Sequence, residues 1–172
     1  MNDKSGIKGK ITWKLIGKDG VIKNSGESTN IVTNQGDDYY VDQLSDAGGS
    51  VAQIFVLGTG TASVGKTDTW VSGYFSNNGT TDGTAGAVAI TTHPTGGSEN
   101  TLRYSGTFAA GYATQDGITR IGLANMVAAA DGNGTPNAST TFFIAHGTID
   151  PTVNKGASDT LVVTWDHTFL GA

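Results

Sequence analysis

The sequence predicts a mainly β protein: an antiparallel β-sandwich of jelly-roll-like form, with one short helix near residues 35–45. Glycine accounts for 26 of the 172 residues and charged residues for only 15%, below the share of about 25% that is usual in globular domains. Short apolar segments alternate with segments rich in Gly, Asn and Asp, which is typical of strands joined by turns. Apolar residues make up 37% of the chain, enough for one hydrophobic core, so residues 1–172 are expected to form a single β domain.

The first expected strand runs from Ile7 to Leu15, where apolar and polar residues alternate with the period of a half-buried strand. Its two sides carry, respectively, Ile7, Ile11, Trp13 and Leu15, and Lys8, Lys10, Thr12 and Lys14. The lysines are interpreted as a solvated face or as a guard against edge-to-edge pairing, with a partner-binding stripe as the third alternative. The turn Gly17–Gly20 then allows Val21 to Glu27 to return as a hairpin arm, because Asp-Gly favours the backbone angles of tight hairpins.

The segment from Asn34 to Ser45 is the expected helix. Asn34 is a suitable capping residue, and Asp37 and Asp38 would lie near the positive end of the helix dipole. One face of this helix would carry Tyr40, Val41 and Leu44. The paired carboxylates do not by themselves predict a metal site, because no second cluster with ligand spacing lies nearby.

The apolar run from Val51 to Leu57 is predicted to be a central strand that is covered on both faces, because only Gln53 interrupts it. A long Gly-rich loop excursion follows over residues 58–100, with room for a small strand pair. Its aromatic group consists of Trp70, Tyr74 and Phe75. Two roles remain open for these side chains: burial in a minor cluster, or contact with a partner chain.

The C-terminal half adds further strands, separated by turn residues. The expected strands are Leu102–Phe108, Ile118–Leu123 and Thr141–Ile149, with turn chemistry over Ala128–Ser139. The last strand, Thr160–Phe169, has the clearest alternation of apolar and polar residues. Its inward side is expected to carry Leu161, Val163, Trp165, His167 and Phe169.

One nucleotide-binding signature occurs in the chain. Gly60, Gly65, Lys66 and Thr67 fit the pattern G-x-x-x-x-G-K-S/T of a phosphate-binding loop. A working loop needs a following helix and an acidic residue for magnesium within an α/β sheet. The residues after Thr67 are β-branched, aromatic and Gly-rich, so the match is interpreted as a chance one. These four residues are expected to form a flexible exit from the apolar strand, and no cofactor is predicted.

Catalytic and metal-binding patterns are weak elsewhere. The histidines His93, His146 and His167 are scattered along the sequence. Asp166 would point to the opposite face of a strand from His167, so this neighbouring pair cannot act as a relay. A stretch with Asp131, Asn133 and Asn137 resembles a calcium loop, but it lacks the required Gly and the bidentate Glu. We therefore expect neither an enzyme nor a metal site.

Charge and composition exclude several further classes. The net charge of −5 opposes sequence-independent nucleic-acid binding, which depends on neutralising phosphates. The chain has no Cys, so stability must come from packing or assembly rather than from disulfides. No signal peptide is expected, and no apolar run approaches the roughly 18 residues of a membrane span. The chain is expected to be soluble and to fold in a reducing cytoplasm.

Five short motifs occur in order along the chain: NIVTNQG (30–36), GTGT (58–61), SGTFAAG (105–111), ITRIGL (118–123) and KGASDTLVVTW (155–165). Together they resemble the motifs of a group of tailed-bacteriophage virion structural proteins. The resemblance spans about residues 30 to 170. The chain departs from the group in the long excursion after the GTGT motif, and in Ala124, which stands where an aromatic residue often follows.

The resemblance implies a non-enzymatic part of a phage particle, made in the cytoplasm of the bacterial host. The favoured location is the virion's outer capsid surface, where a decoration or cement protein would bind the major capsid protein and stabilise the head. A small acidic domain without fibrous repeats or heptads suits that role, as a homo-oligomer such as a trimer. The alternative is a tail, baseplate or fibre-associated protein. A third interpretation, a carbohydrate-binding module, would use Trp70, Tyr74 or Phe75 as stacking platforms.

Overall fold

The computed structural model describes residues 6–44, 53–78, 88–92, 94, 96, 100–125 and 143–170. Nine strands and one helix lie within these ranges. In chain order they are β1 (Gly6–Ile16), β2 (Ile22–Val32), α1 (Asn34–Leu44), β3 (Gln53–Gly58), β4 (Tyr74–Asn77), β5 (Ala89–Thr92), β6 (Thr101–Phe108), β7 (Gln115–Asn125), β8 (Phe143–Lys155) and β9 (Thr160–Leu170).

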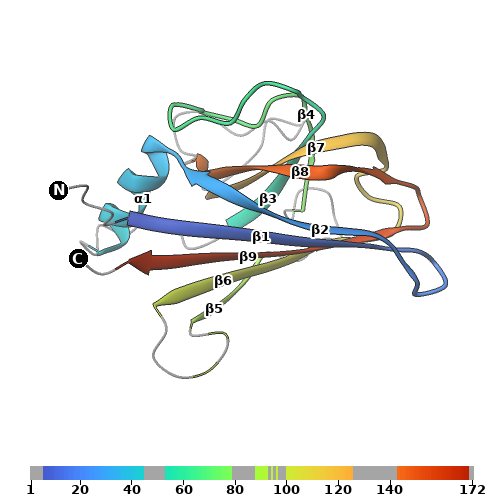
Figure 1. The fold of residues 1–172 in the computed structure, drawn as a ribbon, viewed down its shortest axis with the longest axis horizontal. Helices are drawn as coiled ribbons and strands as arrows, with labels where there is room; N and C mark the ends of the chain where they lie inside the picture. Colours follow the sequence, from blue (N-terminus) through green and yellow to red (C-terminus); the bar gives the residue numbers. More distant parts are fainter. Residues whose placement is uncertain are drawn as a thin grey trace.

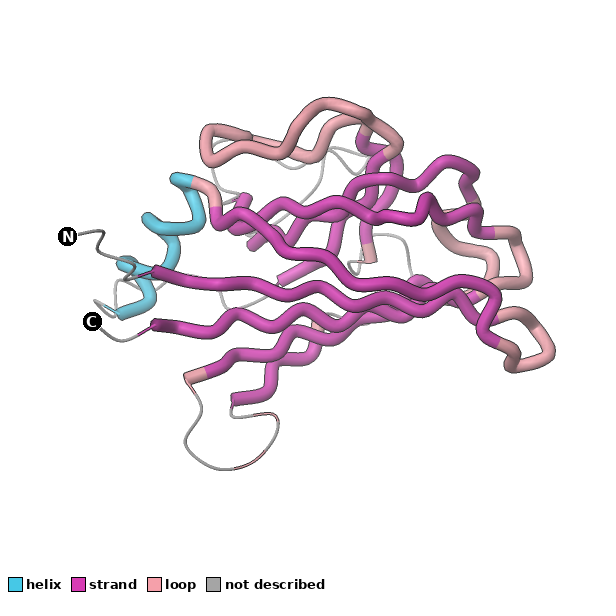
Figure 2. The backbone as a smooth tube through the Cα atoms, viewed as in Figure 1, coloured by secondary structure: helices cyan, strands magenta, loops and turns pink. Residues whose placement is uncertain are grey.

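All nine strands belong to one antiparallel sheet, in the order β4-β3-β7-β8-β2-β1-β9-β6-β5. The sheet curls into a half-barrel, so that the β3-β7-β8 part faces the β1-β9-β6 part (Figure 1). The predicted mainly β, antiparallel fold class is therefore confirmed. The sandwich-like arrangement arises because one continuous sheet curls over itself, and α1 lies at one end of the curl (Figure 2).

Strand β1 lies in the middle of the sheet, between β2 and β9. Both of its edges are paired, so the interpretation of its lysines as a guard against edge-to-edge pairing is wrong. The β1–β2 hairpin forms as predicted: the Gly17 amide donates to the Val21 carbonyl at 2.8 Å, and Gly20 has a φ of 79°. Strand β2 continues beyond Glu27 to Val32, because its far end also pairs with β8.

The helix forms where the sequence predicts it, but with a different cap. Thr33, which is fully buried, accepts a hydrogen bond on its hydroxyl from the Gly36 amide at 3.0 Å. Thr33 is therefore the N-cap residue, and the expectation for Asn34 is wrong. Asn34 is instead the first helical residue, and its amide donates to the carbonyl of Lys66 at 2.8 Å.

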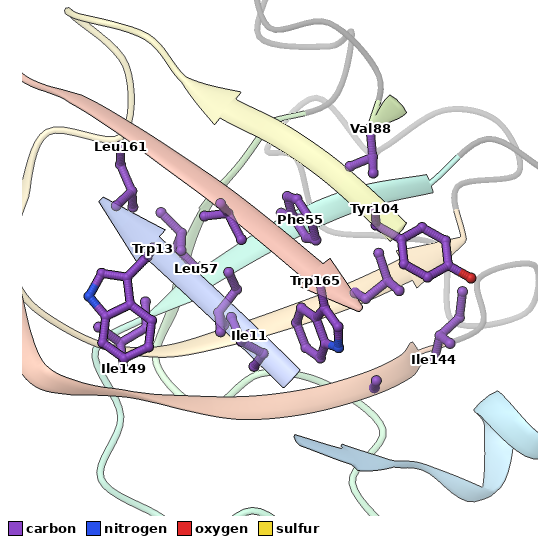
Figure 3. Close-up of a cluster of buried hydrophobic side chains, with 14 of the residues drawn as sticks. Ile11, Trp13, Phe55, Leu57, Val88, Tyr104, Ile144, Ile149, Leu161 and Trp165 are labelled. Carbon is purple, nitrogen blue, oxygen red and sulfur yellow. The ribbon is translucent and has the colours of Figure 1, made fainter. Parts of the chain in front are cut away.

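The main hydrophobic core fills the inside of the curl (Figure 3). The ring of Phe55 on β3 stacks on that of Trp165 on β9, with centroids 6.0 Å apart and planes 11° from parallel. Both side chains are fully buried. Because β3 and β9 are not neighbours in the sheet, this contact joins its two halves across the interior. Burying one such large apolar side chain stabilises the fold by roughly 1.5–3 kcal/mol.

Strand β3 is covered on both faces, as predicted. Phe55 and Leu57 face the main core, whereas Ile54 and Val56 face a second cluster on the other side of the sheet. The buried members of this outer cluster are Ile54, Val56, Val71, Ala124 and Phe143. The segment between β3 and β4 thus lies over the outside of the sheet, and it buries the second face of β3.

The described part of the excursion over 58–100 contains two short strands, but they do not pair with each other. Strand β4 pairs with β3 at one edge of the sheet, and β5 pairs with β6 at the opposite edge. The strands β6, β7 and β9 cover the predicted strands Leu102–Phe108, Ile118–Leu123 and Thr160–Phe169, and β8 covers the described part of Thr141–Ile149, with β7 and β8 extending further. The turn at Ala128–Ser139, His93 and the calcium-like residues Asp131, Asn133 and Asn137 lie outside the described residues.

Candidate functional site

The nucleotide-binding signature lies in the loop between β3 and β4. After Thr67 the chain turns and continues to β4, so no helix follows the motif within the described residues 68–78. The Lys66 ammonium forms an ion pair with Asp37 in the first turn of α1. In a phosphate-binding loop, the lysine reaches the phosphates. The backbone amides that also bind the phosphates lie at the N-terminus of a helix. The geometry around Gly60, Gly65, Lys66 and Thr67 therefore differs from that of such a loop.

Hydrogen bonds hold this loop against the outside of β7. The hydroxyl of Thr119 donates to the carbonyl of Gly60 at 2.7 Å. The Arg120 guanidinium donates twice to the carbonyl of Ala62, at 3.1 Å and 2.7 Å. Side chains of β7 thus hold the carbonyls of this segment, which the sequence predicts to be a flexible exit from β3.

A second attachment of the loop uses His146 on β8. Its Nδ1 lies 2.8 Å from Oδ2 of Asp68, and the same oxygen accepts a hydrogen bond from the Gly65 amide at 2.8 Å. Burial lowers the pKa of His146, and Asp68 opposes this shift only in part. The histidine therefore fastens the loop as a neutral donor.

No local pattern predicts the His146–Asp68 pair, because the two residues are 78 positions apart. A general base must reach the proton that it abstracts. The other ring nitrogen of His146, Nε2, is buried and has no hydrogen-bond partner among the described atoms. The pair thus joins the loop to β8 through Nδ1 alone.

The three aromatic residues of the excursion pack within the chain. The ring of Trp70 lies 5.6 Å from that of Tyr74 and 5.3 Å from that of Phe143, between centroids. Trp70 and Tyr74 pack against the outer cluster, whereas Phe75 packs against the main core. Of the two roles considered for this group, burial in a minor cluster describes Trp70 and Tyr74. All three side chains remain partly exposed.

A buried polar network lies at the end of the curl where α1 sits. Tyr40 Oη on α1 lies 2.5 Å from His167 Nδ1 on β9 and 3.0 Å from Tyr104 Oη on β6. The other ring nitrogen, His167 Nε2, lies 3.1 Å from Nδ2 of Asn30 on β2. Four elements that are distant in the sequence therefore meet at one histidine.

Strand register explains how Asn30 reaches His167. Gly9 on β1 lies between them, opposite Asn30 on one side and His167 on the other. A Cβ atom on Gly9 would lie 1.2 Å from Oδ1 of Asn30, so the amide occupies the space that a side chain at Gly9 would fill. Gly9 is thus required by the network rather than by its own backbone conformation.

Burial sets the protonation of this network. It lowers the pKa of His167 to about 3 and raises that of Tyr104 to about 12. Burial also raises the pKa of Tyr40 well above its usual value. At neutral pH the imidazole is therefore uncharged and both phenols are protonated. Such a network is suited to fixing the position of α1 on the sheet.

A third polar cluster joins two of the motifs that carry the phage resemblance. Lys155, which is only 1% exposed, donates from Nζ to the carbonyls of Ala109 at 2.9 Å and Tyr112 at 2.6 Å. The Gly111 amide donates to the carbonyl of Ala157 at 2.6 Å. The SGTFAAG and KGASDTLVVTW motifs therefore meet in space, in a corner that Lys155 holds together.

Asp159 closes the same corner. Its carboxylate accepts hydrogen bonds from Lys23 Nζ at 2.7 Å and from the Gly156 amide at 3.1 Å. The hydrogen bond from Lys23 is the main cause of its lowered pKa. Asp159 thus joins β2 to the turn before β9. The polar groups of this corner form hydrogen bonds with other residues of the chain.

Among the described residues, no group of three or more His, Asp or Glu side chains is placed to hold a metal ion. No described helix is long and apolar enough to cross a membrane. Comparisons with protein-family models, curated proteins and solved structures find no match. The function therefore has to be argued from the motifs and the geometry of this chain.

Proposed function

We propose that this chain is a non-enzymatic structural protein of a tailed-phage virion. In this proposal it is a decoration or cement protein that binds the outer surface of the capsid. It would bridge neighbouring copies of the major capsid protein and add buried interface, which raises the barrier to disruption of the head. A cyclic homo-oligomer such as a trimer would make several such contacts at once.

The Lys155 corner is the observation that carries the proposal. Two motifs of the resemblance are 44 residues apart from Gly111 to Lys155 in the sequence, yet they share hydrogen bonds in the fold. Each motif alone consists of common residues. Two motifs that contact each other in the fold support the resemblance more strongly than either motif alone. Their joint role is structural, which agrees with the non-enzymatic class that the resemblance implies.

The use of the other reactive side chains supports the same conclusion. Lys66 is paired with Asp37, and His146 with Asp68. His167 is fully buried within its tyrosine and asparagine contacts. These side chains hold the loop and the helix on the sheet. Their interactions therefore stabilise the fold.

The experiment is an add-back assay with phage heads assembled without this protein. Purified protein is mixed with the heads, and bound protein is measured by co-sedimentation. The temperature at which the heads release their DNA is measured in parallel. We expect saturable binding and a higher release temperature. Failure to bind the heads, together with labelling of the tail in intact particles, would contradict the decoration role and favour the tail alternative.

A further inference from the structure

The outward side of β1 carries three lysines in the middle of the sheet. Lys8, Lys10 and Lys14 are all exposed, and β1 is paired along both edges by β2 and β9. Protection of a free edge therefore does not account for them. Their exposure agrees with the expected solvated face. Like charges at alternate positions of one strand repel each other, so an acidic partner on this face would relieve that repulsion.

Only part of this positive charge is neutralised within the chain. Lys10 lies 2.7 Å from Glu27 on β2, and Arg103 on β6 forms two 2.7 Å contacts with Asp166 on β9. Neither Lys8 nor Lys14 has an ion pair with a described residue. Among the described residues of β2, β1, β9 and β6, and apart from the Lys23–Asp159 pair at the hairpin end, the charged side chains of this lysine face are Lys8, Lys10, Lys14, Arg103, Glu27 and Asp166. The face is thus positive on a chain whose net charge is −5.

A shallow depression of about 450 Å³ lies on this face. It is lined by Ile7, Lys8, Gly9, Lys10, Thr29, Asn30 and Thr168. Lys8, Lys10, Thr29 and Thr168 belong to the outward-facing set of their strands, because Thr29 is paired with Lys10 and Thr168 with Lys8. Ammonium groups and hydroxyls are hydrogen-bond donors, so the depression suits a carboxylate.

We propose that the lysine face docks onto a carboxylate-bearing surface of a neighbouring protein in the particle. This inference rests on the proposed virion function and names the side of the chain that makes the contact. Charge complementarity guides such an encounter and fixes its orientation. The net negative charge of the whole chain opposes densely charged nucleic acids and sulfated glycans. A protein surface with a few carboxylates matches a small positive patch of this kind.

The first test uses poly-L-glutamate as the probe and calorimetry as the measurement. We expect binding that weakens about 3-fold in Lys8→Gln and in Lys14→Gln, and about 10-fold in the double variant. The control is Lys18→Gln, because Lys18 is exposed in the β1–β2 turn and makes the same charge change away from the face. Lys8→Arg keeps the charge and should restore binding. Equal affinity of Lys14→Gln, Lys18→Gln and the unchanged protein would overturn the inference.

The second test applies the same variants to heads assembled without the protein. The inference predicts that Lys8→Gln/Lys14→Gln binds the heads more weakly than Lys18→Gln, and that the difference shrinks in high salt. Equal binding of these two variants would overturn the inference but leave the decoration role intact. If the unchanged protein bound poly-L-glutamate in a Lys8- and Lys14-dependent way but bound no heads, the proposed function would fail instead. Tighter binding to heparin or to single-stranded DNA than to poly-L-glutamate would overturn the assignment to a protein partner.

Discussion

The hydroxyl of Tyr40 lies 2.5 Å from Nδ1 of His167, and this contact joins the helix to the last strand of the sheet. Tyr40 is 8% exposed and His167 is fully buried. The helix is thus held at the end of the half-barrel by a specific polar contact as well as by its apolar face.

Tyr40→Phe should destabilise the protein by about 1–3 kcal/mol, because it leaves the buried ring of His167 without one of its partners. The ring packing of residue 40 against Phe169, at 5.3 Å between centroids, would be kept. The measurement is urea unfolding followed by tryptophan fluorescence. Val41→Ala is the matched control on the same helix, because Val41 is 63% exposed. A loss in Tyr40→Phe no larger than in Val41→Ala would show that the contact contributes nothing.

Gly9→Ala should also destabilise the protein, because the added methyl group would displace the side chain of Asn30. The effect should be strongly non-additive with Asn30→Ala, since the double variant has no amide left to displace. A double-mutant cycle by urea unfolding measures this coupling. Gly6→Ala is the control, because a Cβ atom there meets nothing within 4 Å. Additive effects of Gly9→Ala and Asn30→Ala would contradict the proposed crossing of Asn30 over Gly9.

Lowering the pH should destabilise the protein at pH values that are still well above the range in which carboxylates titrate. The pKa of His167 is about 3 in the folded state, against the ordinary value of 6.5. The contribution of the neutral imidazole is therefore complete above pH 6.5 and is lost progressively as the pH falls toward 3. From pH 7 to pH 5 this loss is about 2 kcal/mol.

His167→Gln provides the control for the acid effect. The lowered pKa of His146 acts in the same direction, so this variant should keep only part of the pH dependence. The difference in unfolding free energy between pH 7 and pH 5 should be smaller in His167→Gln than in the unchanged protein. Equal pH dependence in the two proteins would show that His167 is not buried in its neutral form.

Lys155→Met should destabilise the protein by roughly 2–3 kcal/mol, because the carbonyls of Ala109 and Tyr112 would lose a charged donor. The methionine keeps most of the apolar stem, so the loss reports on the ammonium group. Lys18→Met is the control at an exposed position. Thermal unfolding checks both variants, and a similar small shift in the two would refute the structural role of the Lys155 corner.

Lys66→Ala tests the interpretation of the nucleotide-binding signature. We expect no ATP binding by calorimetry in the unchanged protein, and therefore no loss on substitution. The ion pair with Asp37 is exposed, so its removal should change stability by less than about 1 kcal/mol. ATP binding that disappeared in Lys66→Ala would overturn the chance-match interpretation.

Local patterns in the sequence are enough to predict the strands that alternate and the faces that they bury. Ile7 to Leu15 and Thr160 to Phe169 show a period of two, which is a local property of the chain. The two-sided cover of β3 was also predictable, since apolar residues occupy both of its faces. The pattern also predicts the helix, but it places the cap one residue late, because the buried partner of Thr33 lies on β8.

Contacts between distant segments determine which strands are neighbours and which polar groups meet. The central place of β1, the separation of β4 from β5 and the pairing of His146 with Asp68 all depend on contacts between distant segments. The crossing of Asn30 over Gly9 depends on the register of β2, β1 and β9. Local patterns fix the period of an element but not its partner or register, because those follow from how the whole apolar surface is buried.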